Sequence, residues 1–361
     1  MFGRRSVCLK VPALLLVLAL GCAPAAPPAS KDAALKEASA AGQAKAGTEQ
    51  EAQLYEAARK EGELVLYSSN NLEDTREAIA GFEKKYPGIT VKHVRAVRDE
   101  LTQKAISEFQ AGRVAGDIFQ TASFSVADVQ KAGALDVYQR PDLSVYPNDL
   151  KDPNNIWSVS AMLLYAPGYN TTKVKPAEAP KSYEELLDPK WKGRMAVHEL
   201  ETQVTISMMD WWGKEKTVEY WRGIAALTPR VLRGRSLMLD LLVPGEYDLA
   251  ASLHTSSVSE KKAQGAPVEW VHLERHVADF TGEALMRGAP HPSAAKLYLN
   301  WLVGLEGQKT LVAAGRVPVH PQVPSNPPEL KQGLKLYALA PTAGDRSAEA
   351  DRLYKEAFGI K

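Results

Sequence analysis

From residue 51 onward, apolar runs of strand length alternate with amphipathic segments of helical length. The segment 51–62 reads as a helix ending at Gly62, and the run 63–69, ELVLYSS, reads as a strand. A helix over 70–88 follows, and the same alternation continues with a strand at 89–96, a helix at 99–113 and a strand at 116–123. This order is typical of a parallel sheet with helices on its faces, so the sequence predicts an α/β fold.

The second half of the chain continues this alternation, starting with one unusually long apolar run. The run 155–170, NIWSVSAMLLYAPGYN, is far longer than the mean strand of about 5–6 residues. A strand of that length can leave one lobe of a protein and enter another. The remaining elements are expected as helices at 182–193, 202–215, 236–248, 289–315 and 347–359, strands at 194–199 and 249–254, and an extended stretch at 267–286.

The N-terminal residues have the parts of an export signal. Arg4 and Arg5 precede the apolar run Val11–Leu20, and Cys22 follows Gly21 in the pattern of a bacterial lipobox. We expect residues 1–21 to be a signal peptide and residues 22–50 to be a flexible tether attached to lipid through Cys22. The protein is then an exported lipoprotein, periplasmic or at the cell surface, with lipid as its only membrane contact. The alternative is an ordinary signal peptide with a chance cysteine.

Charge and cysteine content exclude several classes of protein. Removal of residues 1–21, which carry three basic and no acidic residues, changes the formal net charge from +1 to −2. A chain so close to neutral has no electrostatic footprint for nucleic acid. Cys8 leaves with the signal peptide, so the remaining Cys22 has no intramolecular partner and a disulfide is not expected.

Polar residues follow several of the predicted strands, where open α/β lobes bind their ligands. The candidate ligand-binding residues are Ser68, Ser69, Asn70, Thr121, Ser123, His198, Glu201, Thr202, Arg235, Ser236, His254 and Thr255. Hydroxyl, amide and guanidinium groups at helix starts suit an anion, with Arg235 as a carboxylate or phosphate clamp. Helix capping by the serines and asparagine is the structural alternative. Glu199 and Glu201 would instead suit a cation, so the charge of the solute stays open, with an anionic or zwitterionic molecule favoured.

Eight phrases occur in the order of one known family. They are LVLYSS, FEKKYPGITV, AGRVAGDIF, LLYAPGYNTTKV, LLDPKWKGRMAV, PVEWV, APHPSAAKLYLNWLVGLEGQ and AAGRVPV. Over Leu54–Gly359 the chain resembles the bacterial ABC-transporter extracellular solute-binding lipoproteins of the ferric-ion-binding kind. The resemblance implies a two-lobed type II periplasmic-binding-protein fold with a ligand cleft. Its hinge-crossing strands would lie near 160–165 and 278–283. It places residues 51–160 plus 283–314 in lobe one and 161–282 plus 315–361 in lobe two.

The same resemblance implies a function. A receptor of this kind closes about a hinge on its solute and delivers it to the permease and ATPase of an ABC importer, usually as a monomer and with neither a catalytic residue nor a cofactor. Ferric-binding members use two adjacent tyrosines, but the corresponding stretch 251–257, ASLHTSS, has none. A small polar solute and no metal site are therefore expected. Two alternatives remain: a receptor for ferric or another metal ion, and an extracellular enzyme on the same scaffold.

Overall fold

The computed structural model describes residues 49–360, apart from residues 71 and 340. The predicted signal peptide, the lipid-attachment residue Cys22 and nearly all of the predicted tether lie outside the described residues. The first described helix begins at residue 49, within the end of the predicted tether, and ends at residue 61. None of the helices in this described part combines the length and the apolar character that a membrane crossing requires.

The described strands form one eleven-stranded sheet. The strands are β1 Glu63–Ser68, β2 Thr90–Arg95, β3 Ile118–Ala122, β4 Trp157–Asn170, β5 Met195–His198, β6 Arg230–Leu232, β7 Leu249–His254, β8 Val268–Trp270, β9 His276–Leu285, β10 Val317–Pro318 and β11 Leu336–Ala338. Their main order is β2-β1-β3-β9-β4-β7-β5-β6, with β8 and β10 paired to β4 and β11 paired to β9.

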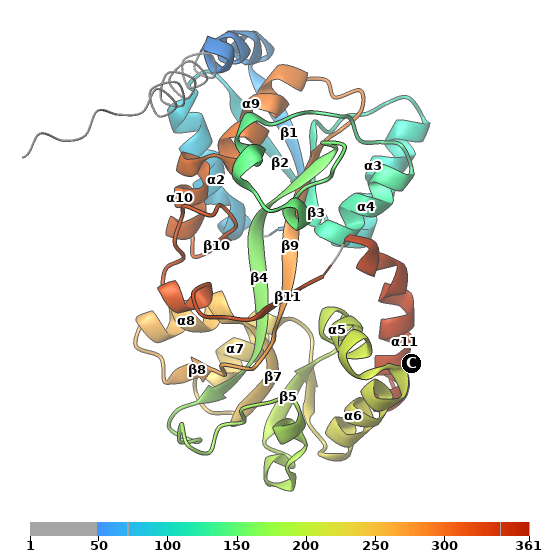
Figure 1. Cartoon of the computed structure of the whole chain (residues 1–361), viewed down its shortest axis with the longest axis vertical. Helices are drawn as coiled ribbons and strands as arrows, with labels where there is room; N and C mark the ends of the chain where they lie inside the picture. Colours follow the sequence, from blue (N-terminus) through green and yellow to red (C-terminus); the bar gives the residue numbers. More distant parts are fainter. Residues whose placement is uncertain (1–48, 71, 340, 361) are drawn as a thin grey trace, which may run out of the picture. The chain divides into compact units, whose positions relative to one another are not determined.

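Two long strands join two parallel groups of this sheet. The first group is β2-β1-β3 and the second is β6-β5-β7, and within each group the neighbours are parallel. β9 and β4 run antiparallel between the groups, as Figure 1 shows. We call the two groups with their covering helices the first and the second lobe. The α/β prediction is confirmed, whereas the exact residues at which one lobe ends stay a prediction.

β4 links the two groups because its two ends pair with different strands. From Trp157 to Tyr165 it pairs with β9, and from Tyr165 to Tyr169 it pairs with β7. Apart from the partly buried Leu163 the whole strand is buried, as expected for a strand covered on both faces, and its polar residues Ser158, Ser160 and Asn170 are buried with it.

The described helices cover both faces of these groups. They include α2 Leu72–Lys85, α3 Arg98–Gln110, α4 Ser123–Lys131, α5 Thr202–Trp212, α6 Lys214–Ala226, α7 Arg235–Leu242, α8 Thr255–Ala263, α9 Pro292–Val303, α10 Leu305–Ala313 and α11 Ser347–Phe358. In Figure 1, α2, α3, α4, α9 and α10 accompany the first group of strands, and α5, α6, α7, α8 and α11 accompany the second.

Three predicted elements differ from the structure. The segment 182–193 forms two short 3-10 turns, because Asp188 and Pro189 end the first turn and begin the second. The helical stretch 289–315 is divided at Gly304 into α9 and α10. The extended stretch 267–286 contains β8 and β9 with a loop between them. The helices α4, α6 and α8 had no counterpart among the predicted elements.

Candidate functional site

Strand ends and helix starts from both lobes surround one cavity of about 350 Å³. Ser69 and Asn70, which follow β1, line it from the first lobe. The second lobe contributes the start of α7 at residues 234–236 and the end of β7 with the first turn of α8. Leu163 of β4 and Arg316, just before β10, complete the lining. We call this cavity the cleft.

The cleft contains five of the twelve candidate residues: Ser69, Asn70, Arg235, Ser236 and His254. All five stand at the ends of strands or at the starts of helices, where backbone N–H groups favour negative charge. None of the described N-cap residues of α4, α5, α7 and α8 makes a side-chain capping bond. No side-chain cap therefore occupies the backbone N–H groups at these helix starts. Ser236 does not act as an N-cap, which was the structural alternative to a role in binding.

The other candidates from the first lobe lie behind the cleft. The Ser68 hydroxyl donates to Gln120 Oε1 at 3.2 Å, and Thr121 Oγ1 is 2.6 Å from Ser69 Oγ. Ser68 and Thr121 are fully buried, and their hydrogen bonds hold the end of β1 and the loop after it against β3. Ser123, the first residue of α4, is also buried, and its hydroxyl has no hydrogen-bond partner among the described residues.

Two candidates from the second lobe also turn away from the cleft. The Thr202 hydroxyl donates to Asp351 Oδ1 at 2.5 Å and so ties α5 to α11. Thr255 is the first residue of α8, and its buried hydroxyl has no partner in the described part of the chain. Neither Thr202 nor Thr255 lines the cleft. Their positions after predicted strands therefore did not place their side chains in the ligand cavity.

Arg235 is held in place from two sides. Its Nη2 lies 2.5 Å from Glu201 Oε2, and its guanidinium carbon stands 4.9 Å from the centre of the Tyr165 ring. Glu201 is completely buried, and burial raises the pKa of its carboxyl, although the charge of Arg235 opposes this shift. Glu201 therefore acts as the counter-ion of Arg235 and does not line the cleft as a ligand for a cation.

The two candidate histidines are neutral at neutral pH. Burial, followed by the charge of Arg235, lowers the pKa of His198 to about 4, and its Nδ1 lies 2.6 Å from the backbone carbonyl oxygen of Leu200. Burial, followed by the charges of Arg235 and Arg316, lowers the pKa of His254 to about 3. Of the two histidines only His254 lines the cleft, and it adds no charge there. The cationic side chains of the lining are Arg235, which is paired with Glu201, and Arg316.

Arg316, which lines the cleft, and Tyr165, which packs against Arg235, were not among the residues selected from the sequence. Arg316 follows a helix end and precedes a two-residue strand, so no strand-end rule points to it. Tyr165 lies in the middle of β4 and contacts both Arg235 and His254, with its ring centre 5.1 Å from that of the histidine. The length of the strand that carries it, together with the family resemblance that placed a hinge crossing near 160–165, marked this region as a crossing.

The side chains around the cleft are poor ligands for a bare metal ion. In residues 49–360, with the two gaps given above, no three histidine, cysteine or carboxylate side chains come together to hold one. Tyr165 is almost fully buried, and burial raises the pKa of its phenol. Asp279 on β9 is also buried, with a pKa raised to about 6, and it accepts from Gln203 Nε2 at 3.2 Å.

Comparison with known proteins shows one consistent family. Residues 77–336 match the family described as "Bacterial extracellular solute-binding protein". "Iron uptake protein A1" of Synechocystis sp. is 27% identical over 286 residues, which cover 73% of this chain and 78% of the relative. "Fe(3+)-binding periplasmic protein" of Serratia marcescens is 22% identical, covering 71% of this chain and 78% of the relative.

Solved structures show the same fold at low sequence identity. IdiA (FutA) of Trichodesmium, in complex with iron and citrate ligands, is 21% identical with a TM-score of 0.68, over 83% of this chain and 100% of that one. The periplasmic binding protein AfuA from Actinobacillus pleuropneumoniae, with fructose-6-phosphate bound, is 20% identical with a TM-score of 0.71, over 83% of this chain and 99% of that one. The predicted type II periplasmic-binding-protein fold is confirmed.

Proposed function

The chain belongs to the family of bacterial extracellular solute-binding proteins, and from this premise we propose that it is the receptor of an ABC importer for iron bound in an anionic complex. In this complex a ferric ion is held by a small organic carboxylate, and the cleft binds the carboxylate oxygens. Membership in this family makes the chain a solute-binding protein, and we propose a permease and an ATPase as its partners. The identity of the solute is our proposal.

Iron enters this proposal through the names of the relatives. Both curated relatives are named for iron, and the Trichodesmium structure contains iron and citrate. These names favour the metal alternative over the small polar anion that the sequence predicted. A function proposed for this chain therefore has to account for iron as well as for the charges in its cleft.

The single observation that carries the proposal is the charge of the cleft. Arg235 and Arg316 line it, and no carboxylate is among the described side chains that do. A bare ferric ion prefers anionic oxygen ligands, and none of the described side chains that line the cleft is a carboxylate or a phenol. A ferric carboxylate complex already supplies such oxygens to the metal and presents others to the arginines, which bind carboxylates in a bidentate manner.

A second candidate solute is an organic phosphate without iron. The same arginines suit a phosphate group, and AfuA is a solved relative in fold with fructose-6-phosphate bound. This candidate corresponds to the anionic solute expected from the sequence. It needs no metal, so an iron assay separates it from the first.

Delivery to the permease follows from closure of the two lobes. We propose that the solute contacts Ser69 and Asn70 from one lobe and Arg235 and Ser236 from the other, so that it stabilises the closed form through its differential affinity. We further propose that the chain acts as a monomer held at the membrane by the lipid on Cys22.

Titration calorimetry of the full chain tests the solute. The probes are ferric citrate, citrate alone, freshly diluted ferric chloride and fructose 6-phosphate. We expect ferric citrate to bind at least about tenfold tighter than citrate, and Arg235→Gln to weaken this binding by about tenfold or more. Arg233→Gln is the matched control, because the Arg233 side chain is 88% exposed and lies outside the cleft lining. Tight binding of iron from ferric chloride without an organic anion would overturn the proposal, and tighter binding of fructose 6-phosphate would favour the second candidate.

A further inference from the structure

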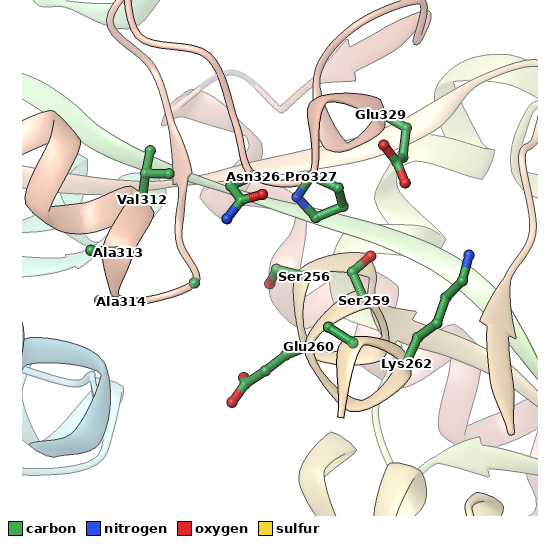
Figure 2. A pocket seen from close by; sticks show the side chains of 12 residues that line it. Ser256, Ser259, Glu260, Lys262, Val312, Ala313, Ala314, Asn326, Pro327 and Glu329 are labelled. Carbon is green, nitrogen blue, oxygen red and sulfur yellow. The ribbon is translucent and has the colours of Figure 1, made fainter. Parts of the chain in front are cut away.

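A cavity larger than the cleft lies beside α8, but its walls do not point to a ligand. It measures about 600 Å³ and is enclosed by α8, the end of α10 and the loop at residues 326–329, as Figure 2 shows. Its carboxylates, Glu260 and Glu329, do not point toward each other. None of its lining side chains is a buried polar group without a hydrogen-bond partner. A buried group of that kind occurs instead at the start of α4.

The start of α4 lies at the edge of the first lobe where ligands are expected to bind. β2, β1 and β3 run parallel with β1 in the middle, so their carboxyl ends meet at one edge. Ser69, which follows β1, lines the cleft there. Its hydroxyl is 2.6 Å from that of Thr121 in β3, and Ser123 begins α4 two residues later. Arg98, which begins α3, follows β2 at the same edge.

Ser123 has a hydroxyl without a partner in the described part of the chain. The residue is 3% exposed, and its Oγ makes no hydrogen bond there. Such groups are rare in folded proteins, because a buried hydroxyl without a partner has lost its bonds to water for nothing in return. Ala122, the N-cap residue, offers no side-chain cap, and the first turn of α4 contains no acidic residue. The hydroxyl and the backbone N–H groups of this turn therefore form a set of donors suited to a negative group.

A glycine in β9 lets this helix start lie directly on one of the strands that join the lobes. A Cβ atom on Gly282 would stand 3.1 Å from the Cα of Ser123 and 3.0 Å from a methyl group of Val126. A side chain at position 282 would therefore press the start of α4 away from the strand. The donors at the start of α4 are thus held close against β9.

Arg98 supplies a positive charge beside these donors. Its guanidinium carbon stands 4.8 Å from the ring centre of Phe124, the second residue of α4, and its Nε donates to Asp99 Oδ1 at 2.9 Å. Its two terminal amino groups make no hydrogen bond with any residue that the structure describes. The side chain is 32% exposed. A guanidinium held on an aromatic ring, with its terminal N–H groups still to be used, is preorganised to bind an oxyanion.

The charge of Arg98 reaches the strands between the lobes. Burial raises the pKa of Asp279 on β9 to about 6, and the charges of Arg98 and Arg235 are among the effects that oppose this rise. Arg98 of the first lobe and Arg235 of the second therefore act on the same position. The carboxyls near Arg98 are engaged elsewhere, since Asp279 accepts a hydrogen bond from α5 and Asp128 lies 3.9 Å from Lys131.

We propose that Arg98, Ser123 and the backbone N–H groups of the first turn of α4 form an oxyanion subsite, which binds a carboxylate or phosphate group of the solute from the first lobe. The solute reaches this subsite when the lobes part, and closure then buries its oxyanion between them. The subsite rests on the proposed function, which supplies an anionic solute, but it requires neither iron nor Arg316. Arg98 is then the residue by which the first lobe selects a negatively charged solute.

Calorimetry of the full chain with three probes tests the subsite. The probes are inorganic phosphate, which is an oxyanion alone, ferric citrate and fructose 6-phosphate. We expect Arg98→Gln to weaken phosphate binding by about tenfold, and Arg98→Lys, which keeps the charge without the fork, to weaken it by about threefold. Arg113→Gln is the matched control, because Arg113 is exposed just beyond the other end of α3, and it should leave each affinity unchanged. The larger loss in Arg98→Gln, with ferric citrate or with fructose 6-phosphate, shows whether the group bound is a carboxylate or a phosphate.

Ser123→Ala separates binding from a structural role. It removes a buried hydroxyl without a partner, so the ligand-free protein should unfold at an equal or higher urea concentration, while phosphate affinity should fall by about fivefold. A lower unfolding midpoint with unchanged phosphate affinity would give the hydroxyl a structural role only and would overturn its place in the subsite.

The outcomes separate the subsite from the proposed function. No phosphate binding, or equal phosphate affinity in Arg98→Gln, Ser123→Ala and the unaltered chain, would overturn the subsite and leave the proposed function to the titration with ferric citrate. Phosphate binding that depends on Arg98, in a chain that binds neither ferric citrate nor fructose 6-phosphate, would remove the proposed function and support an oxyanion subsite for a different solute.

Discussion

The buried ion pair between Arg235 and Glu201 gives the sharpest prediction. Replacement Arg235→Met leaves a completely buried carboxyl without its counter-ion. The folded protein then escapes a buried charge by protonating Glu201. An unfolded glutamate has a pKa of 4.5, so holding the proton at pH 7 costs about 1.36 kcal/mol for each of 2.5 pH units, or about 3.4 kcal/mol. This value agrees with the usual cost of about 3–5 kcal/mol for breaking a buried pair.

The sign of the pH dependence follows from the same arithmetic. A carboxyl whose pKa is raised in the folded state destabilises the protein more as the pH rises. At pH 5 the proton costs only about 0.7 kcal/mol, so we expect Arg235→Met to lose about 1 kcal/mol at pH 5 and about 3–4 kcal/mol at pH 7. Urea unfolding of the purified full chain at both pH values measures this loss. Arg233→Met, at an exposed pair with Glu199, should lose less than about 0.5 kcal/mol.

The reasoning fails in either of two outcomes. Equal losses at pH 5 and pH 7 would mean that Glu201 is not forced to take a proton. A loss below about 1 kcal/mol at pH 7 would mean that water or another donor replaces Arg235. The double variant Glu201→Gln/Arg235→Met should recover most of the stability, because it removes both buried charges together.

Two further predictions concern acid stability and backbone packing. Burial lowers the pKa of His276 to about 4, so the stability that its neutral form contributes is complete above pH 6.5 and declines as the pH falls toward 4. In His276→Gln, the drop in unfolding free energy between pH 7 and pH 4.5 should therefore be smaller by about 2–3 kcal/mol. A drop equal to that of the unaltered protein would refute this prediction. A side chain at Gly307 would overlap the backbone carbonyl of Trp301, so Gly307→Ala should cost about 3 kcal/mol or more in urea unfolding, and a near-neutral result would contradict the packing of α10 against α9.

The fold was predictable because apolar runs of strand length alternate regularly with segments whose apolar residues have helical spacing. The mostly apolar run at 155–170 became β4 almost to the residue, since a strand buried on both faces is mainly apolar along its whole length. The segment 182–193 was wrong as a helix, because Asp188-Pro189 interrupts it and favours two short turns. The spacing of hydrophobic residues alone does not reveal the constraint that Pro189 places on the backbone of Asp188.

The candidate site was only partly predictable. The rule that ligands lie at strand ends led to Ser69, Asn70 and Arg235, which do line the cleft. It does not tell which way a polar residue at a strand end points, so Glu201 was also selected although it faces Arg235 in the interior. Arg316 lies far from the other cleft residues in sequence, and only the paired strands bring it there.

Native mass spectrometry of the full chain after incubation with ferric citrate tests the central claim most directly. The account predicts a complex whose added mass equals one ferric ion together with citrate, and its loss in Arg235→Gln but not in Arg233→Gln. A complex whose added mass is iron alone would contradict the account, because the protein's own side chains would then hold the metal.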